Sequence, residues 1–484
     1  MDEKKSYRFG IKLFCRFLGL IYTIAFLSLW IQIDTLISKN GILPAIEYLA
    51  RLKELSSTQE LPIIPTLFWL GASDFSLHLA GFGGVLCSIL LLLWVAPRLM
   101  AFGCWLFYLS FFHVSQVFLS FQWDILLLEC GLLCILAAPW GRQEVYESRW
   151  LRWALWILIF KLMFSSGVVK LSSQDPVWAN LSALEYHFFT QPIPGPTSWF
   201  FHQLPGWFQS FSTFLMFHIE LVIPFLFLGT HLMRLVGALA TIFLMILIFC
   251  SGNFAYFNLL TIILSFTCIE NRFWVQSWVY SKEEVSQQGG LPLRFFRWCK
   301  DILLILVILL NFIPLMSLFS FSRPWIPGFL NEFQKEVRSF CLVNSYGLFA
   351  NMTTTRPEII IQGSQDGKTW RDYEFYYKPG DPGRRPRQVA PHQPRVDWQM
   401  WFAALRPDYR YVPWFQSFIT KILEGKPEVL RIFEVNPFPE RPPRFIRAVV
   451  FDYQFTNSQQ KRESGNWWKR KPQKLFLPPV SVSR

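Results

Sequence analysis

Nine apolar stretches constrain this chain more than any other feature of its sequence. Most of them are close to the roughly 17 to 25 residues that an α-helix needs to cross a bilayer. Hydrophobic residues make up 52% of the chain and aromatic residues 18%, more than a soluble chain of 484 residues normally carries. The sequence predicts a multipass α-helical membrane bundle of about nine spans, at residues 12–33, 76–96, 99–119, 123–139, 151–170, 211–229, 232–250, 253–270 and 300–320.

The distribution of Lys and Arg orients the predicted bundle. None occurs from Leu171 to Met233, although long apolar runs lie on both sides of this segment. Membrane proteins keep basic loops on the cytoplasmic side, so we expect the loop at 171–210, before the next span, to be exported. An odd number of spans then also exports everything after Phe321. The expected location is the endoplasmic reticulum membrane with a lumenal C-terminus for a eukaryotic source, or the inner membrane with a periplasmic C-terminus for a bacterial one.

A second, water-facing domain is predicted after the last span. The chain thus divides into a transmembrane domain at 1–323 and an exported domain at 324–484, where Pro, Arg and short alternating runs replace the long apolar stretches. Alternation favours strands, whereas a 3.6-residue period favours helices. We expect a β-rich, sandwich-like domain with helical insertions, built from a hairpin at 358–377, helices at 396–405 and 413–423, and extended segments at 445–455 and 474–480.

The exported part carries most of the net charge. From Asn331 to Arg484 there are 25 Lys and Arg against 15 Asp and Glu, which gives +10 of the formal +13. A basic surface suits an acidic client or anionic lipid headgroups, but an ordinary solvated face explains it as well. We expect membrane lipid as a partner and no nucleic acid. We also expect no metal or other cofactor, because no zinc, nucleotide or hydrolase motif is present.

Ionisable residues inside the spans form the candidate site, because a charged side chain in a bilayer costs free energy unless it is paired or hydrated. They are Asp124, Glu129, Lys161, Lys170, His218 and Glu220. One hypothesis is a set of structural ion pairs, in which antiparallel spans place Asp124 level with Lys170. The other is a polar cavity that opens outward. Its mouth would be lined from the basic-free loop by Glu185, His187, Gln191 and His202.

Motifs along both halves of the chain form a further pattern. In the membrane half they are Phe121–Asp124 with Leu126–Glu129, Lys161–Phe164, Tyr186–His187, Thr190–Pro192, His218–Leu221 and Ser251–Asn253. In the exported half they are Tyr346–Phe349, Met352–Thr354, Asp366–Trp370, Tyr376–Asp381, Ala390–Arg395 and Asp397–Leu405. Over nearly the whole chain, this pattern resembles the lipase maturation factor family of endoplasmic reticulum membrane proteins.

The resemblance implies a multipass protein without enzyme activity that helps secreted homodimeric lipases to fold and assemble. It also implies that the lumenal C-terminal domain contacts the lipase client. Within that domain we expect His392, Arg395, Trp398 and Trp401 to recognise clients, since the two tryptophans share one helix face at i, i+3 spacing. The same spacing is typical of core residues, so a buried position for the tryptophans remains the alternative.

A more distant resemblance supplies an alternative function. Gly167–Lys170 at the outer end of a span, followed by Trp178, is similar to the membrane region of vitamin K-dependent carboxylases. In those enzymes the matching lysine serves as a base, so Lys170 would be catalytic here. A lysine can act as a base when burial favours its neutral amine. Asp124 or Glu129 nearby would oppose this role, because a carboxylate favours the charged form.

Overall fold

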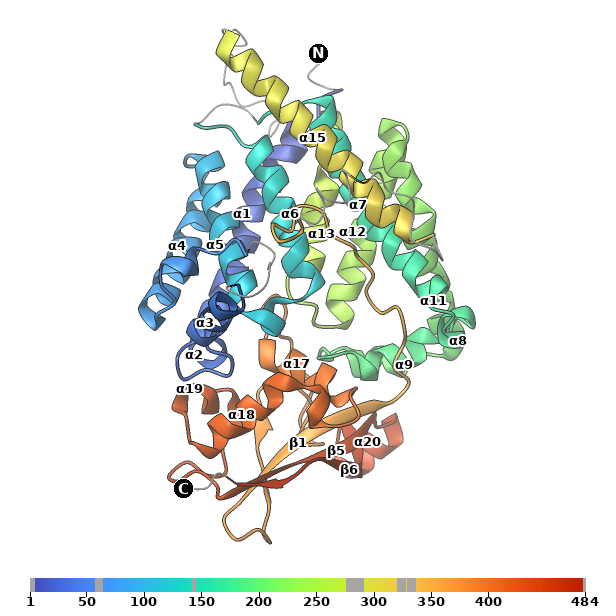
Figure 1. Cartoon of the computed structure of the whole chain (residues 1–484). Coiled ribbons are helices and arrows are strands. Elements are labelled where there is room, and N and C mark those ends of the chain that lie inside the picture. Colours follow the sequence, from blue (N-terminus) through green and yellow to red (C-terminus); the bar gives the residue numbers. More distant parts are fainter. Residues whose placement is uncertain are drawn as a thin grey trace.

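The chain folds into a bundle of long helices and a smaller part that combines helices with a β-sheet (Figure 1). The computed structural model describes residues 5–56, 64–141, 145–275, 291–319, 328 and 337–481. The predicted domain boundary between residues 323 and 324 lies outside these described residues. The start of α1 (Arg8–Trp30) and the last strand, β6 (Trp468–Val480), lie at opposite ends of the molecule.

Each of the nine predicted spans contains a helix. These helices are α1, α4 (Asp74–Leu92), α5 (Pro97–Val114), α6 (Gln122–Ala137), α7 (Arg149–Ser172), α11 (Gly206–Leu221) with the 3₁₀ helix η4 (Ile223–Leu228), α12 (His231–Ser251), α13 (Phe257–Phe266) and α15 (Leu291–Ser317). Together they form the bundle in the upper part of Figure 1.

Six segments of the described residues are long and apolar enough to cross a membrane: Arg8–Trp30, Asp74–Leu92, Arg149–Ser172, Gly206–Leu228, His231–Ser251 and Phe295–Ser317. Helices α5, α6 and α13 are not among them. With 16 residues in α6 and 10 in α13, and about 1.5 Å of rise per residue, neither reaches across a hydrocarbon core of about 30 Å. A multipass bundle is therefore supported, but the predicted count of nine spans is not confirmed.

Helix α1 runs through the bundle at very close range to its neighbours. A Cβ atom on Gly10 would lie 2.2 Å from the carbonyl oxygen of Phe266, and one on Gly19 would lie 2.7 Å from the backbone nitrogen of Leu92. Small residues let helix backbones approach in this way, which increases van der Waals contact where lipid provides no hydrophobic driving force. Glycine at these two positions therefore fixes the contacts of α1 with α13 and α4.

We expect Gly10→Ala to destabilise the bundle by about 1 to 3 kcal/mol. The added methyl group would meet the Phe266 backbone, which cannot rotate away as a side chain can. The melting temperature of the detergent-solubilised protein, followed by size-exclusion chromatography, measures the loss. Gly141→Ala is the control, because a Cβ atom there would meet no atom of the described residues within 4 Å. Equal melting temperatures for the two variants would contradict the close approach.

Basic residues from distant parts of the membrane half meet at one end of the bundle. The Arg234 guanidinium donates to the Tyr7 hydroxyl at 3.0 Å from Nε. Arg8 and Arg152 both contact Glu147, at 3.4 and 3.3 Å. These residues come from the N-terminus, the loop before α7, and helices α1, α7 and α12. The structure brings them together at the end opposite the β-sheet (Figure 1).

Short helices at the other end of the bundle form a layer against the smaller part of the molecule (Figure 1). They are α2 (Ile33–Leu36), α3 (Ala45–Ser56), η2 (Leu67–Leu70), η3 (Gln116–Leu119), α8 (Pro176–Ala179), α9 (Ala183–Thr190) and α10 (Ser198–His202), while η5 (Asn271–Phe273) follows α13 at the basic end. The segment without Lys or Arg, Leu171 to Met233, thus supplies α8, α9 and α10 to this layer.

The C-terminal part contains a four-stranded antiparallel sheet in the order β2-β1-β5-β6. Its strands are β1 (Arg356–Ser364), β2 (Arg371–Asp372), β5 (Phe445–Phe455) and β6 (Trp468–Val480), and β3 (Glu374–Phe375) pairs separately with β4 (Phe433–Val435). The predicted antiparallel turn after β1 and the predicted strand at 445–455 are confirmed. Ile360 lies opposite Val449, which lies opposite Leu475.

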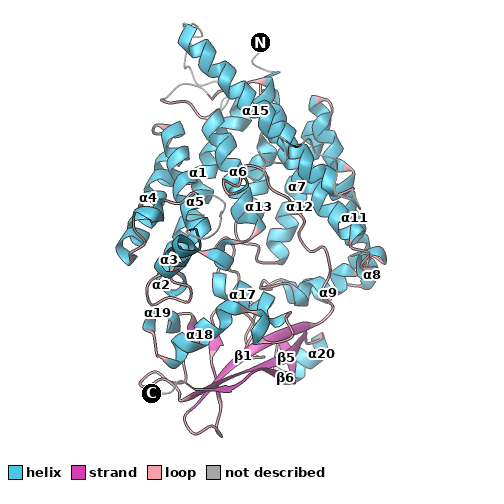
Figure 2. Cartoon of the chain, in the orientation of Figure 1, coloured by secondary structure: helices cyan, strands magenta, loops and turns pink. Residues whose placement is uncertain are grey.

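Helices, and not a second sheet, cover the inner face of this sheet (Figure 2). They include α17 (Arg395–Ala404) and α18 (Pro413–Leu423), which match the two predicted helices, with α19 (Pro427–Leu430) beside them; α20 (Ser458–Ser464) lies between β5 and β6 in the sequence. Phe415 and Phe418 of α18 belong to one buried cluster with Ile361 and Val450 of the sheet. The predicted sandwich is therefore not confirmed, because two helices take the place that a second sheet would fill.

One hydrophobic cluster runs through both parts of the molecule. It includes Leu127 and Leu158 of the bundle together with Tyr346, Trp398 and Ile359 of the C-terminal part. A domain that folds independently has its own core and few contacts across its boundary. The C-terminal part is thus docked on the bundle through a shared core, which brings together the charged groups described next.

Candidate functional site

Asp124 and Arg395 form a fully buried ion pair between the two parts of the molecule. Both side chains have 0% exposure, and the guanidinium donates to both carboxylate oxygens at 2.7 and 2.9 Å. The hydroxyls of Tyr108 and Tyr256 also donate to Asp124, at 2.6 and 2.8 Å. Two parallel hydrogen bonds fix both distance and orientation. The sequence expected Asp124 level with Lys170, but its charged partner is Arg395 of α17.

Glu129 and Lys161 form a second buried pair, inside the bundle. Lys161 Nζ lies 2.7 Å from one carboxylate oxygen, and the side chains are 0% and 2% exposed. The other oxygen accepts from the Tyr346 hydroxyl at 2.7 Å and from Asn344 Nδ2 at 3.1 Å. Residues 337–352 of the C-terminal part thus reach into the bundle. Glu129 holds that segment and α7 with one carboxylate.

Lys170 and Glu220 form a third buried pair, which links α7 to α11. Lys170 Nζ donates to both carboxylate oxygens at 2.8 and 2.7 Å, and to the Ser166 carbonyl at 3.2 Å. An ammonium has three N–H groups, so all three are engaged. The pair faces a cavity of about 230 Å³. His218, which the sequence placed in the same network, is exposed two residues away and lies outside it.

The loop residues predicted at the mouth of a cavity have different positions. His187 lines the cavity, whereas Gln191 is buried and donates to Ser198 Oγ and to the Ser251 carbonyl, both at 3.0 Å. His202 packs against Phe189 and Phe455, with ring centroids 5.3 and 5.7 Å away. Glu185 is partly exposed and does not line the cavity. The structure therefore brings only His187 of these four residues to the Lys170–Glu220 pair.

The predicted client-binding residues lie at the joint between the two parts. Trp398 packs edge-on against Trp123 at 4.8 Å, and the Trp401 indole donates to the Thr190 carbonyl at 2.8 Å. His392 Nδ1 lies 2.9 Å from Ser28 Oγ. Arg395 and Trp398 are buried at 0% and 4% exposure. Arg395, Trp398 and Trp401 are thus covered at the joint, and the tryptophans occupy core positions, whereas His392 is half-buried.

Two amide side chains at the joint were not singled out as site residues. Asn253 accepts from the backbone nitrogens of Val389 and Ala390 at 2.7 and 2.8 Å. Gln393 accepts from the Trp123 indole at 2.6 Å. Both residues lie in motifs on which the family resemblance rests, and those motifs were the feature of the sequence that could have identified them. Each satisfies backbone or indole groups that would otherwise be buried without partners.

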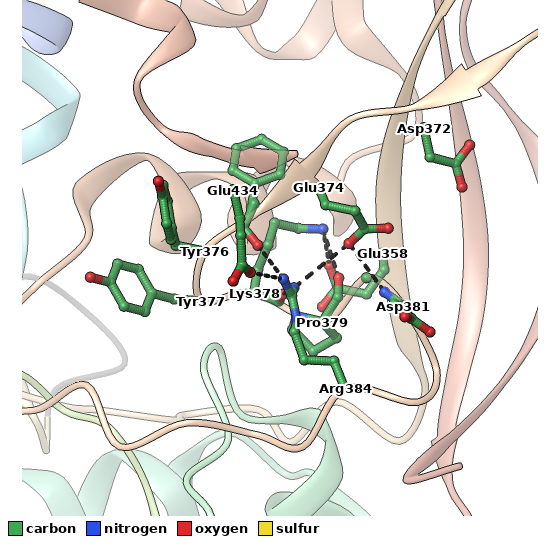
Figure 3. A network of polar contacts seen from close by, with 12 residues as sticks. Glu358, Asp372, Glu374, Tyr376, Tyr377, Lys378, Pro379, Asp381, Arg384 and Glu434 are labelled. Atoms are coloured by element: carbon green, nitrogen blue, oxygen red, sulfur yellow. Dashed lines mark hydrogen bonds and ion pairs between the residues drawn. The ribbon is translucent and has the colours of Figure 1, made fainter. Parts of the chain in front are cut away.

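A polar network inside the C-terminal part fixes its loops (Figure 3). Glu358 is buried between Arg356 at 2.7 Å and Lys378 at 2.9 Å. Arg356 also donates to the Phe189 and Pro192 carbonyls of the bundle side, at 2.7 and 2.9 Å. Near them, Arg384 contacts Glu374 and Glu434, at 3.7 and 2.8 Å. The network therefore ties the sheet to the layer of short helices.

His392 makes the stability of the joint depend on pH. Burial, together with Arg395, lowers the pKa of His392 to about 4 from 6.5. The neutral ring therefore stabilises the fold fully above pH 6.5, and this contribution is lost as the pH falls toward 4. We expect the melting temperature of the wild type to fall more steeply over this range than that of His392→Asn. Parallel pH profiles would contradict the assignment.

Among the described residues, no group of three His, Cys, Asp or Glu side chains could hold a metal ion. The three buried pairs leave no carboxylate of Asp124, Glu129 or Glu220 without a partner. The arrangement is suited to holding helices and domains in fixed positions.

Comparisons with known proteins place the chain in a family. Residues 10–276 match the lipase maturation factor transmembrane domain, and residues 342–478 match the lipase maturation factor C-terminal domain. The chain belongs to the lipase maturation factor family. It is 34% identical to lipase maturation factor 2 of Gallus gallus, over 97% of this chain and 81% of that protein. It is 33% identical to lipase maturation factor 1 of Mus musculus, over 96% of this chain and 86% of that protein. No solved structure matches the chain.

Membership in the lipase maturation factor family confirms the resemblance drawn from the motifs. The relatives are named as maturation factors and not as carboxylases. Lys170 is engaged by both oxygens of Glu220, so the geometry gives no support to a catalytic base at this position either. The three buried pairs of this lipase maturation factor family member are therefore best understood as positioning groups.

Proposed function

We propose that this protein assists the folding and dimer assembly of secreted lipases, which it contacts with its C-terminal part on the exported side of a membrane. The names of the relatives support a lipase client, and the family matches cover both halves of the chain. A folding factor must bind a partly assembled client more tightly than the finished dimer, since only differential affinity shifts an equilibrium. In a eukaryotic source the exported side is the endoplasmic reticulum lumen, and in a bacterium it is the periplasm.

The observation that carries this proposal is the face of the four-stranded sheet opposite α18, here called the outer face, which is partly exposed around Arg447, Val449 and Leu475. Side chains alternate between the two faces of a strand, so Arg447 and Phe451 lie opposite the face that packs on α18. The Arg447 guanidinium lies 4.3 Å from the Trp370 ring centroid, and that of Arg470 lies 4.9 Å from the Phe451 ring. Aromatic and Arg side chains are enriched in protein interfaces.

We expect substitutions on this outer face to weaken client binding by about tenfold or more. The variants are Arg447→Glu and Leu475→Asp; Leu475 is 52% exposed and belongs to the same face. The assay is secreted lipase activity in cells that lack their own maturation factor, together with co-purification of the lipase. Arg410→Glu is the control, because Arg410 is 72% exposed and lies outside the sheet. Wild-type lipase maturation by both outer-face variants would contradict the proposed surface.

The proposed location has its own test. An epitope tag after Arg484 should resist protease in sealed microsomes and become sensitive once detergent opens them. Digestion without detergent would contradict an exported C-terminal part. Deletion of residues 331–484 is a poor test of client binding, because it would leave Asp124 buried without Arg395.

A further inference from the structure

A cavity of about 230 Å³ lies within the bundle beside the Lys170–Glu220 pair. Helices α7, α9, α11, α12 and α13 contribute to its wall, together with residues 348 and 349. Most of the lining is apolar, with Met163, Met216, Leu244 and Phe257 as examples. An apolar cavity of about 150 Å³ already binds benzene and not water. The lining therefore favours an apolar chain as the occupant.

The polar end of the cavity carries no net charge. Lys170 and Glu220 neutralise each other, and all three ammonium N–H groups are engaged within the protein. An anionic headgroup would lie beside the Glu220 carboxylate, and a cationic one beside the Lys170 ammonium. Either charged headgroup would lose more free energy on leaving water than it would gain from its attraction to the Lys170–Glu220 pair, whose opposite charges largely cancel. The site therefore suits an uncharged headgroup.

His187 supplies hydrogen-bonding groups at this end. Its ring packs among Phe254 and Phe349, with centroids 6.1 and 5.2 Å away, and lines the cavity. No residue that the structure describes hydrogen-bonds to its ring nitrogens. Burial, together with Lys170, lowers the pKa of His187 to about 4, so the ring is neutral near pH 7. A neutral imidazole offers one donor and one acceptor, which matches a hydroxyl or an ester carbonyl.

The cavity opens toward the lipid-facing surface of the bundle. Two of its lining residues, Phe208 of α11 and Leu247 of α12, are also 39% and 41% exposed. Their neighbours Phe211 and Ile246 are exposed as well, at 55% and 49%. On helices that cross a membrane, exposed apolar side chains of this kind face the acyl chains. An occupant therefore enters from the bilayer.

We propose that this cavity binds a neutral single-chain glycerolipid, a monoacylglycerol, whose hydroxyl or ester carbonyl hydrogen-bonds to His187 beside the Lys170–Glu220 pair while its acyl chain lies between α11 and α12. The volume is below the range of about 300 to 1,000 Å³ that holds drug-sized ligands. It accommodates part of one chain and excludes a second. The site is distinct from the outer face of the sheet and does not depend on client binding.

Photolabelling of the full-length protein in phosphatidylcholine nanodiscs tests this site. The probe is a monoacylglycerol with a diazirine in its acyl chain and a terminal alkyne, and mass spectrometry locates the labelled peptides. We expect labels on α11 and α12, and at least tenfold less labelling when monoolein is present in excess. Equal amounts of oleate or dioleoylphosphatidylglycerol should leave labelling unchanged. Labels outside these helices, or equal competition by oleate, would overturn the proposal.

Two variants test the cavity itself. His187→Phe removes the ring nitrogens but keeps an aromatic ring, and we expect a loss of labelling of about three- to tenfold, as for one hydrogen bond. Ser212→Phe fills the cavity that Ser212 lines and should abolish labelling. Ser210→Phe is the matched control, because Ser210 is half-buried on the same helix but does not line the cavity. Wild-type labelling of folded Ser212→Phe would overturn the proposal, whatever the result with His187→Phe.

Discussion

Arg395→Met is expected to destabilise the protein by about 3 to 5 kcal/mol, the usual cost of leaving one charge of a buried pair without its partner. Asp124 would remain buried at 0% exposure, with the hydroxyls of Tyr108 and Tyr256 as its remaining side-chain donors. The same substitution removes the link between α17 and the bundle. An unfolding titration in mixed detergent micelles measures the change in free energy.

The double variant Asp124→Asn with Arg395→Met should recover much of this loss, since removing both charges also removes the unpaired one. Asn at position 124 keeps an acceptor for the two tyrosine hydroxyls. Arg410→Met is the matched control, because Arg410 pairs with Asp408 at the same distance of 2.7 Å but is 72% exposed. Exposed pairs contribute about 0 to 1 kcal/mol. Similar losses for Arg395→Met and Arg410→Met would contradict the role given to the buried pair.

Glu129→Gln is expected to release residues 337–352 from the bundle and to cost more stability than Lys161→Met. The Glu129 carboxylate accepts hydrogen bonds from Lys161, Tyr346 and Asn344. Its neutralisation therefore leaves the buried Lys161 ammonium without a counterion and weakens the two other hydrogen bonds. In Lys161→Met the carboxylate still accepts from Tyr346 and Asn344. Losing a charged partner costs about 3 to 5 kcal/mol, and each weakened hydrogen bond adds to it.

Limited digestion with chymotrypsin measures this release. Tyr346 is 3% exposed and should be cut slowly in the wild type and much faster in Glu129→Gln. Tyr411, which is 62% exposed, provides an internal control in the same molecule. Its cleavage rate should stay the same in both proteins. Faster cleavage at both sites would indicate general unfolding and would contradict a specific release of the segment.

These buried pairs bear on the proposed function through orientation. Arg395 and Tyr346 hold the C-terminal part on the bundle at two separate points, Asp124 and Glu129. The sheet is thus held in one orientation relative to the bundle (Figure 1). If a client binds the outer face as proposed, it would meet that face in a constant orientation, which would lower the entropy cost of recognition.

Local patterns predicted many of the elements. The helix at Pro413–Leu423 and the strand at Phe445–Phe455 have the bounds expected from the spacing of apolar residues. The period of such a pattern depends only on neighbours along the chain, so the sequence carries it directly. What covers the inner face of a strand is not encoded in its alternation. For this reason the sequence predicted a second sheet over the inner face, where the structure has α17 and α18.

The number of membrane spans could not be predicted from the sequence for a different reason. Apolar composition marks Phe257–Phe266 as buried in the bundle, but ten residues are too few to cross a bilayer. Neighbouring helices surround α13, and its Tyr256 cap donates to Asp124. Hydropathy does not distinguish a helix buried among helices from one buried in lipid. Only the packing makes that distinction.

The candidate site shows the same division. Because charges inside apolar runs are costly, the sequence alone identified Asp124, Glu129, Lys161, Lys170 and Glu220 as residues that need partners. It did not pair Asp124 with Arg395, which lies 271 positions away. It also placed Arg395 and Trp398 on a client surface, whereas the structure buries them at the joint.

The sequence by itself determined that this is a multipass membrane protein of the lipase maturation factor family, with a basic second part and several charges that require burial and pairing. These properties follow from composition, periodicity and local motifs. The tertiary structure alone decided which charges meet, which aromatic side chains are covered, and which part of the sheet is exposed. Those outcomes depend on contacts between residues far apart in the chain, where free energy is gained only once the whole fold has formed.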